Sequence, residues 1–273
     1  MKYETLFNDE RIQKIGFGTW RIGGGSFPER SQDERALSAL RSALALGYTH
    51  FDTAEMYGAG HSEDLLGRAI RESRMDRAGL FITTKVTPAH LRFDDVLRAC
   101  AGSLHRLGTD YLDLYLIHWP NESIPLEETF RALNQLVTKG KVKYLGVSNF
   151  DLSLLKKSQA LAETPIVTNQ VPYSLSDRSY VKNGVLEYCQ ANNILLTAYS
   201  PVKEGRIKVN PTLQSIAAAH QVSPYQIALA WLVQQPKVIT IPMSFNPDHQ
   251  AENFDAADIE LSDTEMQQLD RPG

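Results

Sequence analysis

The chain has few of the features that mark secreted, membrane or nucleic-acid-binding proteins. It contains only two cysteines, Cys100 and Cys189, and neither has a metal-ligand partner nearby, so we expect no disulfide framework and no metal site. No stretch approaches the about 20 apolar residues of a membrane span, and the first residues lack an apolar signal core. The formal net charge of −4 supplies no basic excess for nucleic acid or anionic lipid. These absences favour a cytoplasmic protein that binds neither nucleic acid nor membrane.

Short apolar runs alternate with segments of helical periodicity along most of the chain. The runs predicted as strands are Ile15–Trp20, Tyr48–Asp52, Leu80–Val86, Tyr111–His118, Tyr144–Ser148, Ile166–Gln170, Ile194–Tyr199 and Val238–Pro242. The segments predicted as helices are Gln32–Leu46, Glu63–Ser73, Phe93–Leu107, Leu126–Lys139, Leu152–Leu161, Val181–Ala191, Leu213–His220 and Pro224–Gln234. This uninterrupted alternation predicts one (β/α)8 barrel domain over residues 1–273, preceded by a small hairpin that turns at Asn8-Asp9.

The glycine spacing of an open dinucleotide-binding sheet, the structural rival of a barrel, is missing. Such a sheet places Gly-x-Gly-x-x-Gly directly after its first strand, and no glycines near Ile15–Trp20 have that spacing. The run Gly23-Gly24-Gly25 is followed by Phe27-Pro28 and opens no helix directly. We therefore interpret this run as a flexible loop beside the barrel mouth, with contact to a cofactor as the alternative.

Polar side chains follow three neighbouring predicted strands at the point where each strand ends. Asp52 ends the second strand and Tyr57 lies in the loop after it, Lys85 lies near the end of the third strand, and His118 ends the fourth. Because the active sites of (β/α)8 barrels are built from the carboxyl ends of the strands, we expect these four side chains to converge.

The chemistry of these four residues is complementary. A tyrosine hydroxyl has an ordinary pKa near 10, and an adjacent lysine ammonium is expected to lower the pKa of Tyr57 by favouring its phenolate. Asp52 is expected to keep the ammonium of a buried Lys85 charged. His118 can orient or polarise a carbonyl group. The set predicts that Tyr57 donates a proton to a carbonyl oxygen while the carbonyl carbon receives a hydride.

Seven ordered motifs resemble those of the aldo-keto reductases over nearly the whole chain. They are Asp52–Gly58, Lys85, Ile117–Pro120, Gly146–Phe150, Asn169–Gln170, Tyr199–Pro201, and Ile241–Pro242 followed by Ser244. The resemblance implies an NADP(H)-dependent oxidoreductase that interconverts small-molecule carbonyls and alcohols on a (β/α)8 barrel. A monomer is the default for this family.

The resemblance also implies a role for individual residues. The catalytic set would be Asp52, Tyr57, Lys85 and His118, and the substrate walls would be Trp20, Tyr57, His118 and Trp119. Around the nicotinamide, Ser148, Asn149 and Gln170 would bind the carboxamide and Tyr199 would stack on the ring. The other implied cofactor contacts are Gly18, Thr19, Trp20 and Asp52 near the first strands, Ser200, Pro201 and Val202 along the pyrophosphate, and Ser244, Phe245, His249, Glu252 and Asn253 around the adenosine.

Two departures from the family pattern concern the adenosine 2′-phosphate, which distinguishes NADPH from NADH. Met243 stands where NADPH-preferring members place a lysine, and His249 stands where they place an arginine. Histidine gives a weaker and pH-dependent contact than a bidentate arginine. We expect a weakened preference for NADP(H), so that NAD(H) serves as well, unless Lys203, Arg206 or Lys208 reaches the phosphate from another loop.

Further expectations concern the substrate, the acids near the site and the rival functions. The chain has no long loop after Asn253, which suggests an open pocket that accepts small aldehydes, ketones or dicarbonyls. Glu55 is expected to be solvated or helix-pairing, and Glu63 suits the first turn of a helix.

One rival function is an aldolase in which Lys85 forms a Schiff base, but that role requires an uncharged lysine. The other is a cofactor-sensing regulatory protein with little turnover.

Overall fold

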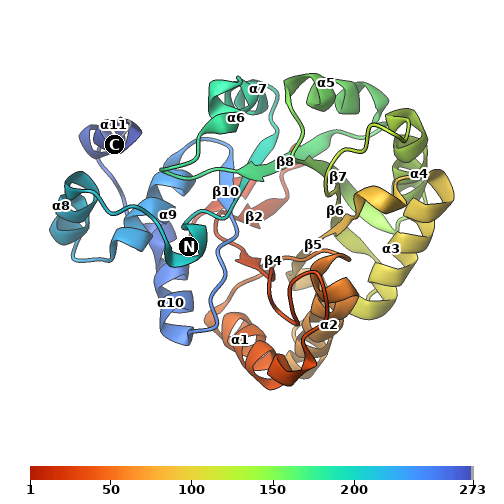
Figure 1. Cartoon of the computed structure of the whole chain (residues 1–273), viewed down its shortest axis with the longest axis horizontal. Helices are drawn as coiled ribbons and strands as arrows, with labels where there is room; N and C mark the ends of the chain where they lie inside the picture. The colour runs from red at the N-terminus through yellow and green to blue at the C-terminus, as the bar shows by residue number, and fades with distance from the viewer. Residues whose placement is uncertain (272–273) are drawn as a thin grey trace.

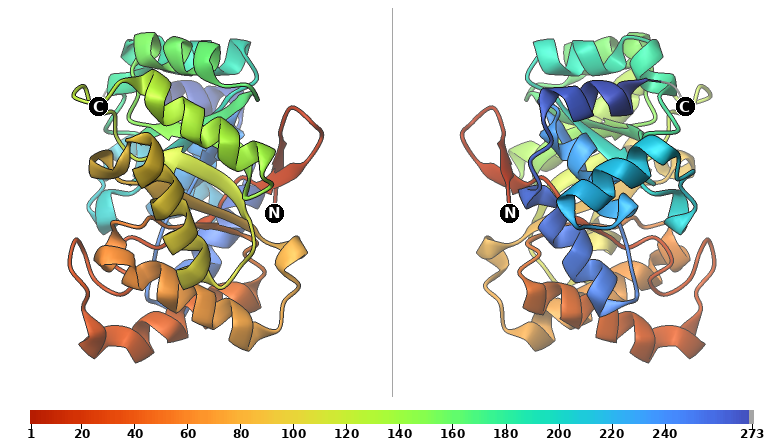
Figure 2. Two further views of the ribbon diagram at one scale, coloured as in Figure 1. Left: turned by 90° about the vertical axis from the view of Figure 1, so that its right-hand side faces the viewer. Right: turned by 90° about the vertical axis from the view of Figure 1, so that its left-hand side faces the viewer.

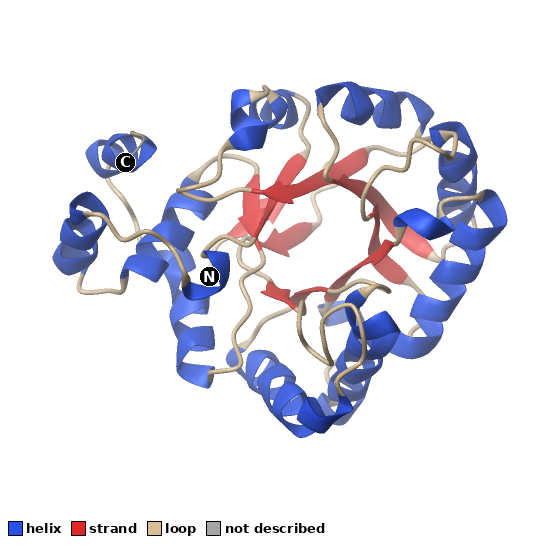
Figure 3. Cartoon of the chain, viewed as in Figure 1, coloured by secondary structure: helices blue, strands red, loops and turns tan. Residues whose placement is uncertain are grey.

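Eight parallel strands form a barrel in the structure, a computed structural model that describes residues 1–271 (Figure 1). The strands are β3 (Phe17–Gly18), β4 (His50–Asp52), β5 (Phe81–Val86), β6 (Leu112–Ile117), β7 (Val142–Ser148), β8 (Ile166–Pro172), β9 (Leu195–Tyr199) and β10 (Val238–Thr240). They are hydrogen-bonded in sequence order, and a parallel bridge between Ile15 and Thr240 joins the last strand to the chain before the first. The ring of strands in Figure 3 is therefore closed by hydrogen bonds.

Helices surround the barrel and alternate with its strands. The α-helices are α1 (Asp33–Leu46), α2 (His61–Ser73), α3 (Phe93–Leu107), α4 (Leu126–Thr138), α5 (Leu152–Leu161), α6 (Ser179–Lys182), α7 (Val185–Ala191), α8 (Pro211–His220), α9 (Pro224–Gln234), α10 (Pro247–Asp255) and α11 (Asp263–Asp270). The short 3₁₀ helices are η1 (Arg30–Gln32), η2 (Tyr57–Gly60), η3 (Arg77–Gly79), η4 (Pro88–His90), η5 (Lys203–Gly205) and η6 (Ala256–Asp258). The predicted (β/α)8 barrel is thus confirmed.

The predicted N-terminal hairpin is also confirmed. Strand β1 (Tyr3–Thr5) pairs antiparallel with β2 (Arg11–Gln13), and Asp9 turns the chain with a left-handed φ of 66°. In Figure 2 the hairpin projects from one end of the barrel. Its Leu6 and Ile12 belong to the same buried cluster as barrel residues such as Leu116. The hairpin therefore covers the barrel interior at the end opposite the carboxyl ends of the strands.

The boundaries differ from the predictions where a local feature interrupts a pattern. The segment predicted as one helix over Val181–Ala191 is two helices, α6 and α7, because Gly184 between them takes a left-handed φ of 77°. The first strand is much shorter than Ile15–Trp20, since only Phe17–Gly18 pairs continuously with β4. Helix α9 is buried over Ile227–Val233, and α8, α10 and η6 pack around it.

Candidate active site

The four residues of the predicted catalytic set lie at the carboxyl ends of neighbouring strands. Asp52 is the last residue of β4, Lys85 is the residue before the last of β5, and His118 directly follows β6. Tyr57 opens the 3₁₀ helix η2 in the loop after β4. The parallel pairing of these strands brings their ends to one edge, so the local order of the sequence alone is enough to group them.

The Lys85 ammonium is completely buried and is the centre of this group. Its Nζ donates to Asp52 Oδ1 at 2.5 Å, to the Thr53 carbonyl at 2.8 Å and to the Tyr57 hydroxyl at 3.3 Å. All three protons of the ammonium therefore have an acceptor, which a buried lysine needs in order to stay charged. This pairing opposes the aldolase alternative, because a Schiff-base lysine has to lose its proton.

The direction of the pKa shift of Lys85 also supports a charged ammonium. Burial acts most strongly on the Lys85 ammonium and lowers its pKa, but the Asp52 carboxylate and Tyr57 outweigh burial and leave the pKa of Lys85 raised. Burial also raises the pKa of Tyr57 more than Lys85 lowers it. The expectation that Lys85 brings the pKa of Tyr57 down is therefore wrong in its net direction, since desolvation of the phenolate is the larger effect. A raised pKa keeps the proton on the Tyr57 hydroxyl at neutral pH.

His118 is held neutral beside Tyr57. Burial, followed by the charge of Lys85, lowers the pKa of His118 to about 2. Its ring lies edge-on to Tyr57, with 5.6 Å between the centroids, and stacks on Trp119 at 4.0 Å. Trp20 lies edge-on to Tyr57 on another side, at 5.0 Å. Trp20 and Trp119 are each 37% exposed, so they present accessible apolar surface, Trp20 beside Tyr57 and Trp119 beside His118.

The glycine-rich run after the first strand supports the turn that presents Tyr57. The backbone N–H of Gly58 donates to the Gly25 carbonyl at 2.6 Å. Gly58 has a left-handed φ of 57°, and a Cβ there would lie 2.7 Å from the Gly23 carbonyl oxygen. The two loops therefore pack backbone against backbone, which only glycine allows at position 58. This contact is a role for the run that its sequence pattern did not indicate.

Glu63 lies in the first turn of α2, as the sequence predicts. It is completely buried, where it accepts hydrogen bonds from Thr84 Oγ1 and Arg106 Nε, both at 2.6 Å. Burial raises the pKa of Glu63 against the opposing effect of Arg106. These bonds connect α2, β5 and α3 behind the catalytic group. Glu55 is also more engaged than expected, since its carboxylate accepts from the Thr87 backbone N–H at 2.6 Å.

The residues implied for the nicotinamide form a connected polar cluster at the ends of β7, β8 and β9. Ser148 Oγ donates to the Gln170 carbonyl at 2.9 Å, and Asn149 Nδ2 donates to Ser148 Oγ at 3.0 Å. The Tyr199 hydroxyl donates to Asn149 Oδ1 at 2.9 Å. Gln170 Nε2 donates to Asp52 Oδ2 at 2.7 Å, so this cluster shares a carboxylate with Lys85.

Strained backbone accompanies this cluster. Asn149, at the end of β7, has a φ of 63°, and Ser200, at the end of β9, has a φ of 51°. A left-handed conformation is costly for residues with a side chain and is concentrated at ligand-binding sites. Gly18 and Thr19 are also buried at this edge, where Ser62 Oγ donates to Thr19 Oγ1 at 2.8 Å.

The residues implied for the phosphates and the adenosine lie after the last two strands. Pro201 and Val202 follow Ser200 and lead into η5. Ser244 and Phe245 are half-buried in the loop after β10, and Asn246 caps α10 by accepting from the Asp248 N–H at 2.9 Å. The remaining residues of this group lie on α10, where His249 and Glu252 are exposed and Asn253 is half-buried.

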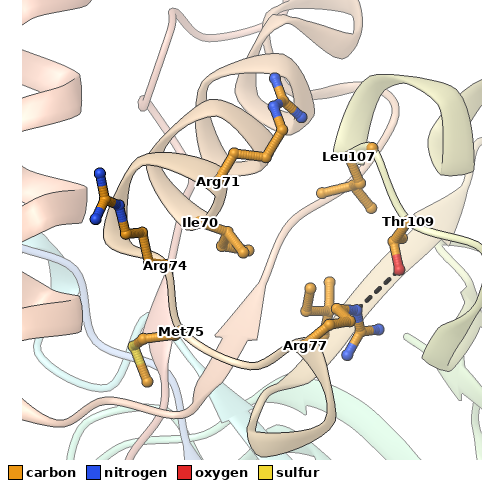
Figure 4. Close-up of a pocket in the computed structure, with 9 residues that line it drawn as sticks. Ile70, Arg71, Arg74, Met75, Arg77, Leu107 and Thr109 are labelled. Atoms are coloured by element: carbon orange, nitrogen blue, oxygen red, sulfur yellow. Dashed lines mark hydrogen bonds between the residues drawn. The ribbon is translucent and has the colours of Figure 1, made fainter.

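A separate cavity of about 200 Å³ lies at the opposite end of the barrel, where α2 and α3 end (Figure 4). Its charged lining is Arg71, Arg74 and Arg77. Arg77 pairs with Asp113 at 2.7 Å and donates to Thr109 Oγ1 at 2.9 Å. Cations stabilise the carboxyl ends of helices, so these arginines have a structural reason to gather there. The cavity has no connection with the catalytic group.

Other kinds of site are not seen in the described residues. Among residues 1–271, no group of three or more His, Cys, Asp or Glu side chains could hold a metal ion. Cys100 and Cys189 are buried and unpaired, and burial is the main cause that raises the pKa of each thiol to about 12. No helix in this part of the chain is long and apolar enough to cross a membrane.

Comparison with known proteins agrees with this geometry. A model of the aldo/keto reductase family matches residues 14–272. The chain is 36% identical to the methylglyoxal reductase YeaE of Escherichia coli over 269 residues, which cover 96% of this chain and 92% of that protein. It is 35% identical to the glyoxal reductase of Bacillus subtilis over 265 residues, which cover 97% of this chain and 90% of that protein.

Solved structures give the same result. A thermostable aldo-keto reductase, Tm1743, in complex with the inhibitor epalrestat superposes with a TM-score of 0.97 at 47% identity, and the match covers 100% of both chains. An aldo-keto reductase of Klebsiella pneumoniae in complex with NADP and acetate superposes with a TM-score of 0.87 at 35% identity, covering 97% of this chain and 93% of that one. The chain therefore belongs to the aldo-keto reductase family, whose members are NADP-dependent oxidoreductases.

Proposed function

We propose that this protein reduces small aldehydes, ketones and dicarbonyls to alcohols, with Tyr57 as the proton donor. The observation that carries the proposal is the buried Lys85 ammonium, which donates both to Asp52 and to the Tyr57 hydroxyl. A protonated tyrosine beside a fixed positive charge can release its proton into a carbonyl oxygen, because Lys85 stabilises the phenolate that remains. Asp52 acts through Lys85 by keeping it charged.

The residues around the site fit a nicotinamide cofactor. Ser148, Asn149 and Gln170 carry both donors and acceptors, which is what a carboxamide group requires. The half-buried ring of Tyr199 is the flat surface on which a nicotinamide would stack. When bound, the cofactor supplies the hydride that a carbonyl carbon receives. The chain's own part is to orient that ring, exclude water and deliver the proton at Tyr57 Oη.

The substrate class follows from the accessible walls of the site. Trp20, Trp119 and the neutral His118 present apolar or uncharged surfaces beside Tyr57, and Lys85 is completely buried. Neutral carbonyl compounds suit such a pocket. The relatives named methylglyoxal reductase and glyoxal reductase support small dicarbonyls as members of this class.

The cofactor preference is proposed to be weaker than is usual in the family. Met243 is half-buried and packs against the hydrophobic core, and His249 is exposed on α10. Neither side chain supplies the permanent charge that a 2′-phosphate attracts most strongly. We expect NADPH to be used and NADH to serve as a second cofactor.

Replacing Tyr57 with phenylalanine tests the proposal. The Tyr57→Phe variant keeps the ring that packs against Trp20 and His118 but loses the donor, so carbonyl reduction should fall by about 10²- to 10⁴-fold. The Kd of NADPH should change by less than about twofold, since the ring wall remains. The control is Tyr115→Phe, because Tyr115 is a buried tyrosine of β6 whose hydroxyl has no hydrogen-bond partner in the described part of the chain.

The outcomes separate two functions. Retained turnover in Tyr57→Phe would show that another group donates the proton. A wild-type protein that binds NADPH yet reduces no carbonyl in a panel of aldehydes, ketones and dicarbonyls would favour the cofactor-sensing alternative. Loss of activity in both tyrosine variants would point to damage of the fold and not to removal of the donor.

A further inference from the structure

The loop after the last strand should lie close to a phosphate of the cofactor but carries no fixed positive charge. In (β/α)8 barrels a phosphate site is frequently built from the loops after strands seven and eight and a short following helix. Here that loop is Met243–Asn246, which leads directly into α10. The only basic side chain of α10 is the exposed His249. A 2′-phosphate bound there needs a cation from another part of the chain.

Helix α1 supplies such a cation. Arg35 lies in the first turn of α1, and its guanidinium carbon is 4.5 Å from the centroid of the Phe245 ring. Within residues 1–271, the guanidinium forms no ion pair and no hydrogen bond. A guanidinium over an aromatic face is held in one orientation while its in-plane N–H donors stay available to an anion.

Hydrogen bonds through Gln250 hold helix α1 against this loop. Gln250, which is completely buried in α10, donates from Nε2 to the Ser244 carbonyl at 2.8 Å and to the Ala39 carbonyl of α1 at 3.1 Å. The Tyr48 hydroxyl donates to the Gln250 carbonyl at 2.8 Å. Helices α1 and α10 lie side by side in Figures 1 and 2 and pack against each other. The loop after β10 and helix α1 are therefore joined at Ala39, about one turn after Arg35.

We propose that Arg35, supported by the Phe245 ring, recognises the adenosine 2′-phosphate of NADPH in place of the side chains at positions 243 and 249. The inference rests on the proposed function, since it assumes that the adenosine lies beside the loop after β10. It assigns to Arg35 whatever preference for NADPH over NADH this protein has. Guanidinium–phosphate contacts are strong because they are charge-assisted and can be bidentate.

Direct binding measurements test this without turnover. The probes are NADPH, NADH, 2′,5′-ADP and 5′-AMP, titrated by calorimetry into the wild-type protein, Arg35→Gln and Arg35→Lys. Arg35→Gln should raise the Kd of NADPH and of 2′,5′-ADP by about tenfold, which corresponds to the loss of about 1.4 kcal/mol. The Kd values of NADH and 5′-AMP should change by less than about twofold. Arg35→Lys keeps the charge without the planar fork and should give an intermediate loss.

A matched control is available at the other side of the barrel. Arg131 of α4 is also exposed and also lies over an aromatic ring, with its guanidinium carbon 4.5 Å from the centroid of Phe93. Arg131→Gln removes the same charge and the same kind of contact. It should leave all four Kd values within about twofold of the wild type. Its thermal stability also shows what losing such a contact costs the fold.

The other possible results contradict either the role of Arg35 in 2′-phosphate recognition or the proposed function, and these two failures can be told apart. Equal weakening of NADPH and NADH by Arg35→Gln would mean that Arg35 only supports the loop. An unchanged Kd for 2′,5′-ADP would also overturn the inference. The variants Lys203→Gln, Arg206→Gln and Lys208→Gln would then identify the loop after β9 as the source of the charge. If the wild-type protein binds none of the four probes, the proposed function itself fails.

Discussion

The buried pair of Lys85 and Asp52 gives the sharpest energetic prediction. In the Asp52→Asn variant, the completely buried Lys85 ammonium loses its counterion but keeps the Thr53 carbonyl and the Tyr57 hydroxyl as acceptors. At the observed Nζ–Oδ1 distance of 2.5 Å and an effective dielectric constant of about 20, the lost attraction is about 7 kcal/mol. The asparagine dipole and relaxation of the site recover part of this energy.

The energetic penalty of an unpaired Lys85 charge in Asp52→Asn is limited, because Lys85 can release its proton instead. Releasing that proton at pH 7, about 3.5 pH units below its ordinary pKa of 10.5, costs about 5 kcal/mol. Breaking a buried ion pair by removing one partner generally costs about 3–5 kcal/mol. We therefore expect Asp52→Asn to lower the free energy of unfolding by about 3–5 kcal/mol at pH 7. Carbonyl reduction should fall with it, because Lys85 no longer stabilises the Tyr57 phenolate.

The pH dependence provides an independent check. In the wild type the pKa of Lys85 is raised above 10.5, so its contribution to stability is present below pH 10.5 and is lost as the pH rises through the folded-state pKa. In Asp52→Asn, burial is no longer outweighed and the pKa of Lys85 should lie below 10.5. The unfolded state of the variant then binds more protons than the folded state, and its stability should rise with pH from neutrality towards pH 10.5.

Denaturant unfolding of both proteins at pH 7 and pH 9 measures these effects through the midpoint and the slope. The control is the double variant Asp52→Leu with Lys85→Met, which removes both charges and should be less destabilised than Asp52→Asn. A loss below about 1 kcal/mol, with no change in the pH dependence, would refute the conclusion that Lys85 is charged and depends on Asp52.

Two further predictions concern the preference for NADPH and the buried imidazole of His50. Replacing Met243 with lysine and His249 with arginine should lower the Kd of NADPH by about tenfold and change that of NADH by less than about twofold; an equal gain for both cofactors would contradict a 2′-phosphate role for these positions. Burial lowers the pKa of His50 from 6.5 to about 4, so the wild type should lose stability as the pH falls through this range, by up to about 3 kcal/mol from this residue. His50→Gln should flatten the profile measured by thermal unfolding between pH 4 and pH 7, and an unchanged slope would show that His50 is not buried as a neutral ring.

The order of strands and helices could be predicted from the sequence because it depends on local patterns. Helix Phe93–Leu107 has the predicted bounds, since its periodicity is strong and Gly108 ends it with a left-handed φ of 67°. The catalytic group could be found for the same reason, because parallel strands bring residues at their carboxyl ends together whatever the details of packing. The break at Gly184 cannot be predicted in this way, since a single glycine inside a helical pattern does not by itself end a helix.

Residue types and their positions along the chain are enough to predict the family, the barrel and the convergence of Asp52, Tyr57, Lys85 and His118. The tertiary structure decided the direction of the Tyr57 pKa, because burial can be weighed against the charge of Lys85 only when the surroundings are known. It also decided that Arg35 lies on Phe245. Closure of the barrel places the last strand beside the first, and only that closure brings two residues so distant in sequence into contact.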